Sequence, residues 1–423
     1  MLLALLGSLA FAQDDPPPPA EEAPIAEPAN PWDKTGFGFG GLPAINYNSD
    51  SGFGYGVLAS VYKYDGGTAP YKWSTTLLLY KTTKNVHVHR IDFDLLDAFD
   101  QPLRLTGRAE FYATLTDHYC GVDPAVYCDS GVGLGDGGVA VERADDLGLT
   151  GTERDDFIRR YYRIRQMTPN GTVNALYKVN DLPHKLEIMA GWWGQYLIPG
   201  SFGETGPWPD SKFDEDFPGG QSGFWSNLQA GVSLDNRDNE PAPTKGYWAE
   251  ASLRGGHKFI GSDWDYVGYN LTLRGYASPF GPRAVFTTRA VADGVFGEVP
   301  ATGMSRPGGR QIYAFYGGQR AGRGVRSGGV IGKARFMDQM EVRLLAASPE
   351  VMGTTIDIHP VGFFDTGYFA ADHSSLNDGA FVYGYGGGLR LAFNKNFIIR
   401  ADLGFSPIEN NSMQVYIDVR NLW

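Results

Sequence analysis

The stretch Tyr316-Gly-Gly-Gln-Arg-Ala-Gly-Arg-Gly-Val-Arg-Ser-Gly328 places three arginines among glycines in a long segment without regular alternation. Glycine allows the backbone to turn where a Cβ atom would clash, so this loop can fold tightly and tuck inward. A guanidinium that is buried in this way needs a carboxylate partner, because an unpaired buried charge is costly. The candidate partner is Asp365, in the strand-like stretch Phe363-Phe-Asp-Thr-Gly367.

Apolar and polar residues alternate around this loop, from about Gly36 to the end of the chain. In the stretches 340–344, 397–405 and 413–423, the apolar side chains fall on one face of a strand. The opposite face collects charges of both signs, namely Glu341, Arg343, Arg400, Asp402, Asp418 and Arg420. A transmembrane barrel hides its hydrophobicity in every second residue in this way. A soluble β-sandwich also alternates, but the motifs and the leader described below favour a barrel.

The spacing of the alternating segments predicts the number of strands. At roughly 24 residues per strand and connection over roughly 390 residues, the count is about sixteen. Short connections (65–70, 98–102, 180–184, 278–282 and 394–396) alternate with long ones (117–156, 199–222, 298–335 and 370–379). With a periplasmic N-terminus, the long loops lie outside and the C-terminus returns to the periplasm. We therefore predict an all-β fold, a transmembrane antiparallel β-barrel of about 16 strands over residues 35–423.

The first 34 residues read as a leader followed by a tether. Residues 1–12 form an apolar run that ends in Ala-Phe-Ala, the small-x-small pattern of a signal-peptidase site, which predicts a signal peptide cleaved after Ala12. Residues 13–34 are rich in Pro, Ala and Glu, and such a segment forms neither a core nor a regular helix. We expect it to be disordered.

Composition excludes several classes of function. The net charge of −12 argues against a nucleic-acid partner, whose phosphates call for a basic face. Two histidines, His87 and His89, share a strand face, but no third metal ligand is visible at useful spacing, and polar wall residues are the better interpretation. The sequence shows neither a serine–histidine arrangement nor a phosphate loop. We expect no enzymatic activity, no cofactor and no metal.

The two cysteines, Cys120 and Cys128, stand eight positions apart in a loop-like stretch. An oxidising compartment would let them close a small ring, whereas a reducing one would leave free thiols. A disulfide is the favoured reading.

Several motifs in the C-terminal half resemble the BamA/TamA-like outer-membrane barrels. Gly322-Arg-Gly-Val325, just after Gly317-Gly318, is similar to the Arg-Gly loop motif of that family, and Phe363-x-Asp365-x-Gly367 is similar to its partner motif. The turn 235–246 and the stretches 384–390 and 399–404 also resemble the family, in the same order. The N-terminal half matches only in architecture.

This resemblance implies a contact inside the barrel. In the family, the loop arginine reaches into the lumen and contacts the aspartate of the wall. Carried over, Arg323 and Gly324 meet Asp365 and Gly367, either as a functional latch or as a structural strut. The neighbouring Arg320 and Arg326 are expected to be solvated or paired with lumen carboxylates such as Glu341 and Glu250.

The resemblance also implies a function at the seam where the barrel closes. The first strand, over residues 36–47, contains Gly40, Gly41 and Pro43, and proline cannot donate a ladder hydrogen bond. Its pairing with a last strand ending in Trp423, which resembles the sorting signal of outer-membrane proteins, is therefore expected to be weak. The family's insertases open such a seam so that a client strand adds to the edge. Alternatively, the glycines only accommodate barrel curvature.

Taken together, the resemblance predicts a barrel in the bacterial outer membrane that inserts or translocates proteins. The alternatives are a passive pore plugged by residues 298–335 and a structural surface barrel. The expected partners are outer-membrane lipid, lipopolysaccharide and a periplasmic partner or client protein. A separate periplasmic partner is expected because the segment between the tether and the first strand is too short for the family's periplasmic modules.

Overall fold

The computed structural model describes residues 34–68, 70–122, 128, 138–179, 185–240, 242–310, 316–393 and 397–419. The leader, the tether up to residue 33, the turns 180–184 and 394–396, Arg420 and Trp423 lie outside these described residues.

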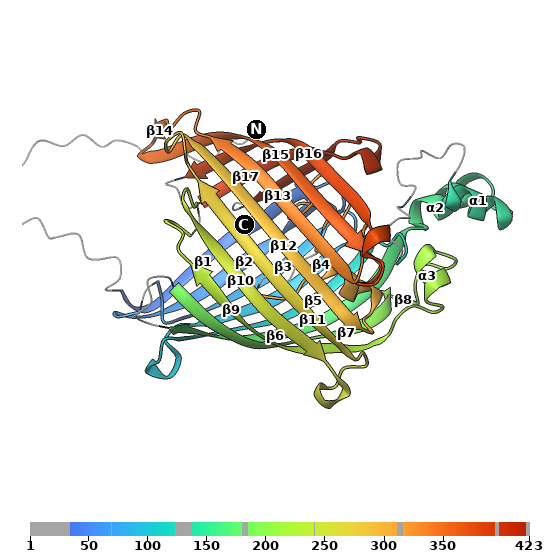
Figure 1. Ribbon diagram of the computed structural model, residues 1–423, viewed down its shortest axis with the longest axis horizontal. Helices are drawn as coiled ribbons and strands as arrows, with labels where there is room; N and C mark the ends of the chain where they lie inside the picture. The colour runs from blue at the N-terminus through green and yellow to red at the C-terminus, as the bar shows by residue number, and fades with distance from the viewer. Residues whose placement is uncertain are drawn as a thin grey trace, which may run out of the picture.

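In the described part of the chain, sixteen long antiparallel strands form a closed barrel (Figure 1). Each strand pairs with its neighbours in sequence, and the last pairs with the first. The first eight are β1 (Thr35–Asn48), β2 (Gly52–Asp65), β3 (Trp73–Thr82), β4 (His87–Leu95), β5 (Leu103–His118), β6 (Arg163–Val179), β7 (Lys185–Ser201) and β9 (Gly223–Asp235). The other eight are β10 (Gly246–Gly256), β11 (Tyr266–Ala277), β12 (Ala284–Gly297), β13 (Ala334–Leu344), β15 (Thr354–Ala370), β16 (Ala380–Phe393), β17 (Phe397–Phe405) and β18 (Gln414–Val419). The predicted fold class and strand number are confirmed.

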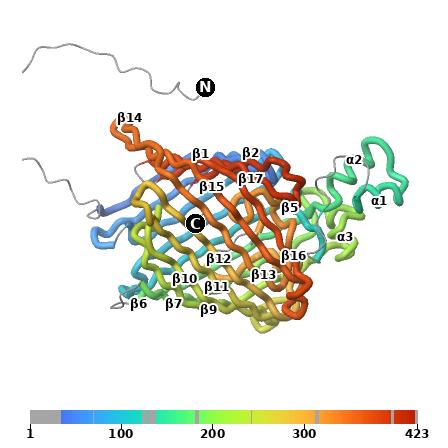
Figure 2. Tube along the Cα trace, turned by 45° about the horizontal axis from the view of Figure 1, so that its top comes forward, coloured from blue at the N-terminus to red at the C-terminus, as the bar shows by residue number. Residues whose placement is uncertain are grey.

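The predicted long connections lie at one end of the barrel and the predicted short ones at the other. The connections after β5, β7, β12 and β15 share the first end, here called the long-loop end, which also holds the turns after β1 and β3 and the connections after β10 and β17. Figures 1 and 2 show the helices at this end and the hairpin of β14 (Glu350–Val351) with β15 projecting from the other, the short-turn end. The short strand β8 (Glu204–Thr205) extends β7 on the helical side.

The helices in the long loops were not predicted. These are α1 (Val139–Asp146), α2 (Gly151–Arg160) and α3 (Lys212–Asp216), and single 3₁₀ turns occur at Ala98–Asp100, Lys258–Ile260, Ala301–Ser305, Leu376–Asp378 and Pro407–Glu409. Helices α1 and α2 share a small core with the disulfide, built around Phe157 and Tyr161. Among the described residues, no helix has the length and apolar character to span a membrane.

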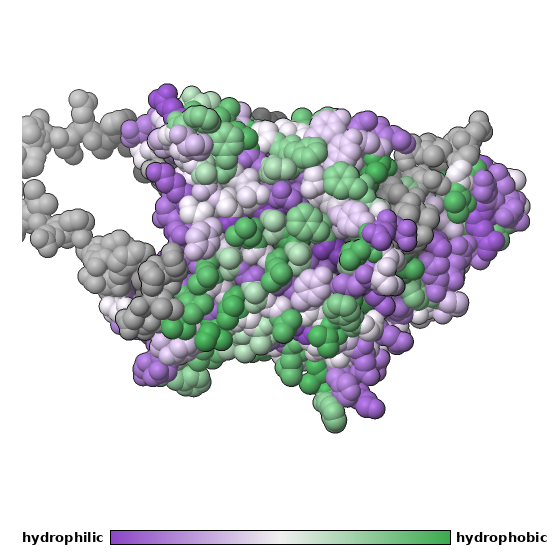
Figure 3. Space-filling model, in the orientation of Figure 1, coloured by the Kyte–Doolittle hydropathy of each residue, from purple (hydrophilic) through white to green (hydrophobic). Residues whose placement is uncertain are grey.

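The two faces of the wall differ as the alternation predicts. On the outside, large apolar side chains are exposed, for example Phe39 (80%) and Leu253 (64%), and they spread over the barrel surface in Figure 3. On the inside, Arg400 and Asp402 of β17 are buried, as are Glu341 and Arg343 of β13. An apolar exterior around a charged interior is the pattern of a barrel whose solvent is the hydrocarbon of a bilayer.

The segment 298–333, called the plug loop here, connects β12 to β13 and folds into the lumen. Apolar side chains of the loop pack against apolar side chains of the wall. The loop residues are Tyr316, Ala321, Val325 and Val330, and the wall residues are Val291, Met337, Phe369 and Val382. The loop was predicted to fold inward over 298–335, and its described residues do so, except that Ala334 and Arg335 belong to β13. Burial of this apolar cluster fixes the loop against the C-terminal half of the barrel.

Candidate functional site

Arg323 of the plug loop is fully buried and contacts Asp365 of β15 through three hydrogen bonds. Its backbone N–H and Nε donate to Oδ2 of Asp365 at 2.9 Å each, and Nη2 donates to Oδ1 at 2.8 Å. The contact implied by the family resemblance is thus present, and it has the bidentate geometry that makes arginine–carboxylate pairs strong. The guanidinium also lies 3.6 Å from the ring centroid of Phe363.

A balanced set of charges surrounds this pair inside the barrel. Arg323 Nη1 also donates to Glu341 at 2.5 Å and lies 3.6 Å from Asp402. Glu341 accepts further from Arg343 at 3.0 Å and from Arg390 at 2.8 Å, and Arg400 lies 3.3 Å from Asp418. Four arginines (323, 343, 390 and 400) therefore meet four carboxylates (341, 365, 402 and 418). Burial alone lowers the pKa of Arg323, but the charges of Asp365 and Glu341 raise it above its ordinary value, so the guanidinium stays charged.

Missing side chains on the wall let the plug-loop backbone approach closely. Gly384 of β16 lies directly opposite Asp365, and a Cβ atom there would collide with the Arg323 carbonyl oxygen. Gly324 has a φ of +94°, and its N–H donates to the Tyr416 hydroxyl at 3.1 Å. A Cβ at Gly367 would meet the rings of Phe369 and Tyr316. The glycines of both motifs therefore serve docking of the loop.

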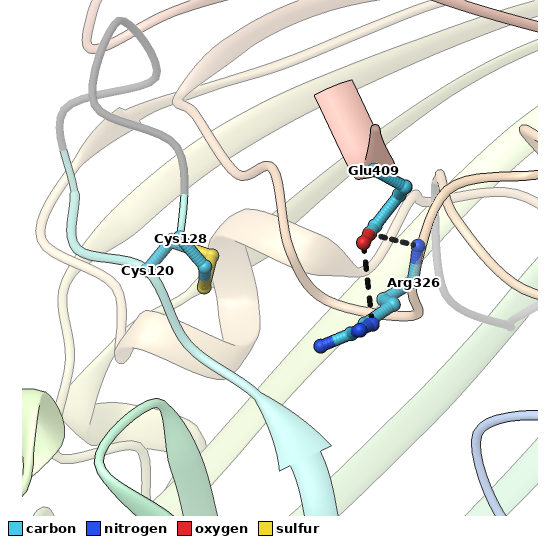
Figure 4. The surroundings of a disulfide bond; sticks show 4 residues. All are labelled: Cys120, Cys128, Arg326 and Glu409. Atoms are coloured by element: carbon cyan, nitrogen blue, oxygen red, sulfur yellow. Dashed lines mark hydrogen bonds and ion pairs between the residues drawn. A yellow bond between two sulfur atoms is a disulfide. The ribbon is translucent and has the colours of Figure 1, made fainter. Parts of the chain in front are cut away.

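The expectation for the neighbouring arginines was wrong in part. Arg326 pairs neither with Glu341 nor with Glu250, but with Glu409 on the connection between β17 and β18, at 3.2 Å (Figure 4). Arg320 is exposed and lines a cavity between the plug loop and the wall, which agrees with the solvated alternative. Glu250 instead accepts from the backbone of Arg310 at 3.0 Å. The partner of Arg326 is non-local, because it depends on how the loop folds back.

A second buried network in the lumen was not predicted. Asp293 of β12 accepts from Arg254 at 2.9 Å and from Arg335 at 2.6 Å. It also accepts from the plug-loop backbone at Gly308, at 2.9 Å. The alternation over 284–297 already places Asp293 on the inner face, so the aspartate was visible in the sequence, but its partners on other strands were not.

The seam between β1 and β18 is short in the described part of the chain. Tyr47 pairs with Ile417 and Asn48 with Tyr416, whereas β1 pairs with β2 over its whole length from Thr35. Beyond these pairs, β18 is described for two more residues, Asp418 and Val419, which do not pair with β1. Gly40, Gly41 and Pro43 lie farther along β1, at register positions beyond the described part of β18, so their effect on the seam stays a prediction.

Other predicted residues fall outside the lumen. Cys120 and Cys128 form a disulfide at the long-loop end, so the favoured reading is confirmed (Figure 4). His87 and His89 pack against each other and, with Phe111 and Phe202, form an aromatic group. The described residues contain no group of three His, Cys, Asp or Glu side chains that could hold a metal ion.

Solved structures similar to this barrel include BamA and CdiB barrels. BamA from Haemophilus ducreyi lacking POTRA domains 1–3 aligns with a TM-score of 0.53 at 12% identity, over 92% of this chain and 70% of that chain. CdiB from Escherichia coli aligns with a TM-score of 0.56 at 11% identity, over 93% and 63%. CdiB from Acinetobacter baumannii aligns with a TM-score of 0.51 at 13% identity, over 90% and 59%.

Sequence comparisons add no closer relative. Neither protein-family profiles nor curated proteins match the chain. The chain spans 70%, 63% and 59% of the three aligned structures, respectively. At identities of 11–13%, the similarity establishes the barrel fold, and it is the fold that agrees with the family resemblance of the motifs.

Proposed function

We propose that this chain is a BamA/TamA-like barrel of the bacterial outer membrane that inserts proteins into that membrane or translocates them across it. The observation that carries the proposal is the seam, where Asp418 and Val419, the last described residues of β18, follow two pairs with β1 and do not themselves pair with it. An unpaired strand edge offers backbone donors and acceptors to an incoming strand, which is how β-augmentation recruits a client.

The plug loop supports the same proposal. Arg323 fixes the loop to three wall strands through Asp365, Glu341 and Asp402, so the lumen is filled on the C-terminal side of the barrel. A filled lumen leaves the seam as the route for an apolar strand. We further propose a separate periplasmic protein that delivers the client, as expected from the sequence.

Insertion is tested with purified barrel in liposomes. An unfolded outer-membrane β-barrel client is added to vesicles with and without the protein, and folding of the client is followed by its resistance to protease. The proposal predicts that the protein accelerates insertion. A client that folds equally fast in empty vesicles contradicts it.

A second candidate, a plugged pore, is favoured by one observation. Two cavities of about 230 and 310 Å³ lie between the plug loop and the wall strands β1–β6, and polar residues such as Asn46, Arg90 and Gln166 line them. Planar-bilayer conductance before and after deletion of residues 300–331 separates the candidates. A pore gains conductance on deletion and inserts no client.

A further inference from the structure

The plug loop touches both sides of the seam at the end where the described pairs between β1 and β18 lie. This end is the long-loop end, where Ser49 follows β1 and donates its N–H to the Val415 carbonyl of β18 at 3.1 Å. Val415 donates its own N–H to the Ser49 hydroxyl at 2.9 Å. A loop that binds both edge strands here controls the last contacts that hold the seam.

On the C-terminal side, the loop binds the β17–β18 connection through Arg326. Glu409, which ends the 3₁₀ turn before β18, is fully buried. Its carboxylate accepts from the backbone N–H of Arg326 at 3.0 Å and lies 3.2 Å from Nε of the same residue (Figure 4). The Tyr416 hydroxyl on β18 accepts from Gly324, as described above.

On the N-terminal side, the loop meets Asp50 in the turn between β1 and β2. Gly318 faces the Asp50 carboxylate, and Ser327 lines the same cavity as Asp50. Lys84, from the turn between β3 and β4, donates to the Ser49 carbonyl at 2.6 Å. The loop therefore bridges Asp50 and Glu409, two carboxylates on opposite sides of the seam.

The positive charges around Asp50 do not fully offset the effect of burying its carboxylate. Burial and the charge of Glu409 raise the pKa of Asp50 to about 7, although Arg326, the Ser327 backbone and Lys84 act in the opposite direction. Arg163 lies close enough for its charge to act on Lys84, and the charges of Arg326, Arg163 and Lys84 all act on the buried His118. Asp50 in turn lies close enough for its charge to act on the Tyr416 hydroxyl. Arg326 and Lys84 oppose the two carboxylates, but burial and the charge of Glu409 outweigh them, so the closed arrangement favours the protonated form of Asp50.

We infer that the plug loop is a proton-sensitive clasp on the seam, closed when the Asp50 carboxyl is protonated and loosened when it ionises. The inference concerns closure of the two edge strands, and it stands whether or not the barrel inserts proteins.

The direction and range of the effect follow from linkage. Opening of the seam exposes Asp50 to water and returns its pKa toward the ordinary value of 3.8. Closure is therefore favoured below that value and weakens progressively as the pH rises toward 7, above which no further change occurs. If opening fully restores the ordinary pKa, the closing equilibrium falls by about fiftyfold between pH 5 and pH 7.

Hydrogen–deuterium exchange of the purified barrel in detergent measures this equilibrium. Exchange of peptides covering 45–52 and 406–419 is recorded at pH 5, 6 and 7 and corrected for the intrinsic pH dependence of amide exchange. A peptide from the β10–β11 hairpin reports effects on the barrel as a whole. The inference predicts that protection of the two seam peptides falls by tenfold or more, while protection of the hairpin stays constant.

Two substitutions separate the clasp from a merely structural cluster. Asp50→Asn removes the titrating group, so seam protection should be high and the same at pH 5 and pH 7. Asp378→Asn, an exposed carboxylate at the same end of the barrel, should behave as the unchanged protein. Seam protection that does not change with pH in the unchanged protein overturns the inference, and so does an equal pH dependence in Asp50→Asn.

Discussion

Arg323 links one loop to three strands of the wall, because β13, β15 and β17 each present a carboxylate to it. The cost of removing this guanidinium from water is large, and the three carboxylates and the ring of Phe363 offset it. Such a residue is sensitive to the geometry of its partners as well as to their charge. Substitutions that keep the charge and those that remove it therefore have different consequences.

Replacement of Asp365 by Asn removes the bidentate partner of a fully buried arginine. We expect the barrel to lose about 3 kcal/mol of stability, since breaking a buried pair leaves an uncompensated charge. Arg323→Lys keeps the charge but loses the planar fork, so a smaller loss is expected. The measurement is the temperature at which the folded barrel loses its anomalous electrophoretic mobility, with Asp378→Asn as the control. An unchanged transition in Asp365→Asn would show that the pair does not stabilise the fold.

Gly384 tests the docking of the loop separately from its charge. A Cβ atom at this position would collide with the Arg323 carbonyl, so Gly384→Ala should displace the plug loop and expose its arginines to trypsin. Gly362 of β15 faces outward with nothing within 4 Å of a Cβ, so Gly362→Ala is the matched control. We expect at least tenfold faster cleavage after residues 320–326 in Gly384→Ala alone. Equal cleavage of both variants would mean that the loop tolerates the collision.

At the scale of elements, the long loop between β5 and β6 has a core of its own. This core contains the disulfide, Ala140, Ala144, Phe157 and Tyr161. The Tyr161 hydroxyl donates a hydrogen bond to Glu215 of the β7–β9 connection at 2.9 Å. This small core is separate from the lumen clusters, so it can lose order without opening the barrel.

Removal of the disulfide should act on this loop alone. A ring of this size contributes about 2–3 kcal/mol through the entropy of the unfolded loop. The paired replacement of Cys120 and Cys128 by Ser should therefore speed proteolysis within residues 138–162, while the barrel keeps its heat-modifiable mobility. A fall in the barrel's own transition temperature would contradict the independence of the two cores.

The strands could be predicted because each carries its alternation locally. Ile417 and Val419 lie outward and Tyr416 inward, as the pattern over 413–423 requires. The loop helices α1 and α2 were missed, since their short apolar stripes are covered by a disulfide core whose packing depends on distant residues. Their sequences are too polar to indicate a helix without that core.

At the scale of the molecule, a contact inside the lumen could be predicted only where sequence motifs identified both of its residues. The Arg323–Asp365 contact came from the family resemblance, and alternation alone placed Glu341, Asp402 and Asp293 on the inner face. Which arginine each carboxylate meets depends on strand register and on the path of the plug loop. Neither can be predicted from sequence when the residues are far apart in the chain. The observed partner of Arg326, Glu409, was therefore not among the carboxylates named as examples, and the network around Asp293 was missed.

The position of the described pairs between β1 and β18 is likewise a property of the whole barrel. Glycine and proline in β1 indicated a weak seam. That the described pairs lie at Tyr47 and Asn48 follows from barrel closure. The contacts between plug loop, Asp50 and Glu409 gather at that same end. In the described part of the chain, the contacts that hold the seam therefore gather at the long-loop end.

A cross-link across this seam tests the central claim most directly. Tyr47 and Ile417 lie opposite each other, so cysteines at both positions, in a Cys120→Ser and Cys128→Ser background, can bridge β1 and β18. Insertion of an unfolded β-barrel client into liposomes is measured with the bridge oxidised and then reduced. The account predicts that oxidation abolishes the acceleration and that reduction restores it. Equal insertion in both states would contradict a function that depends on opening of the seam.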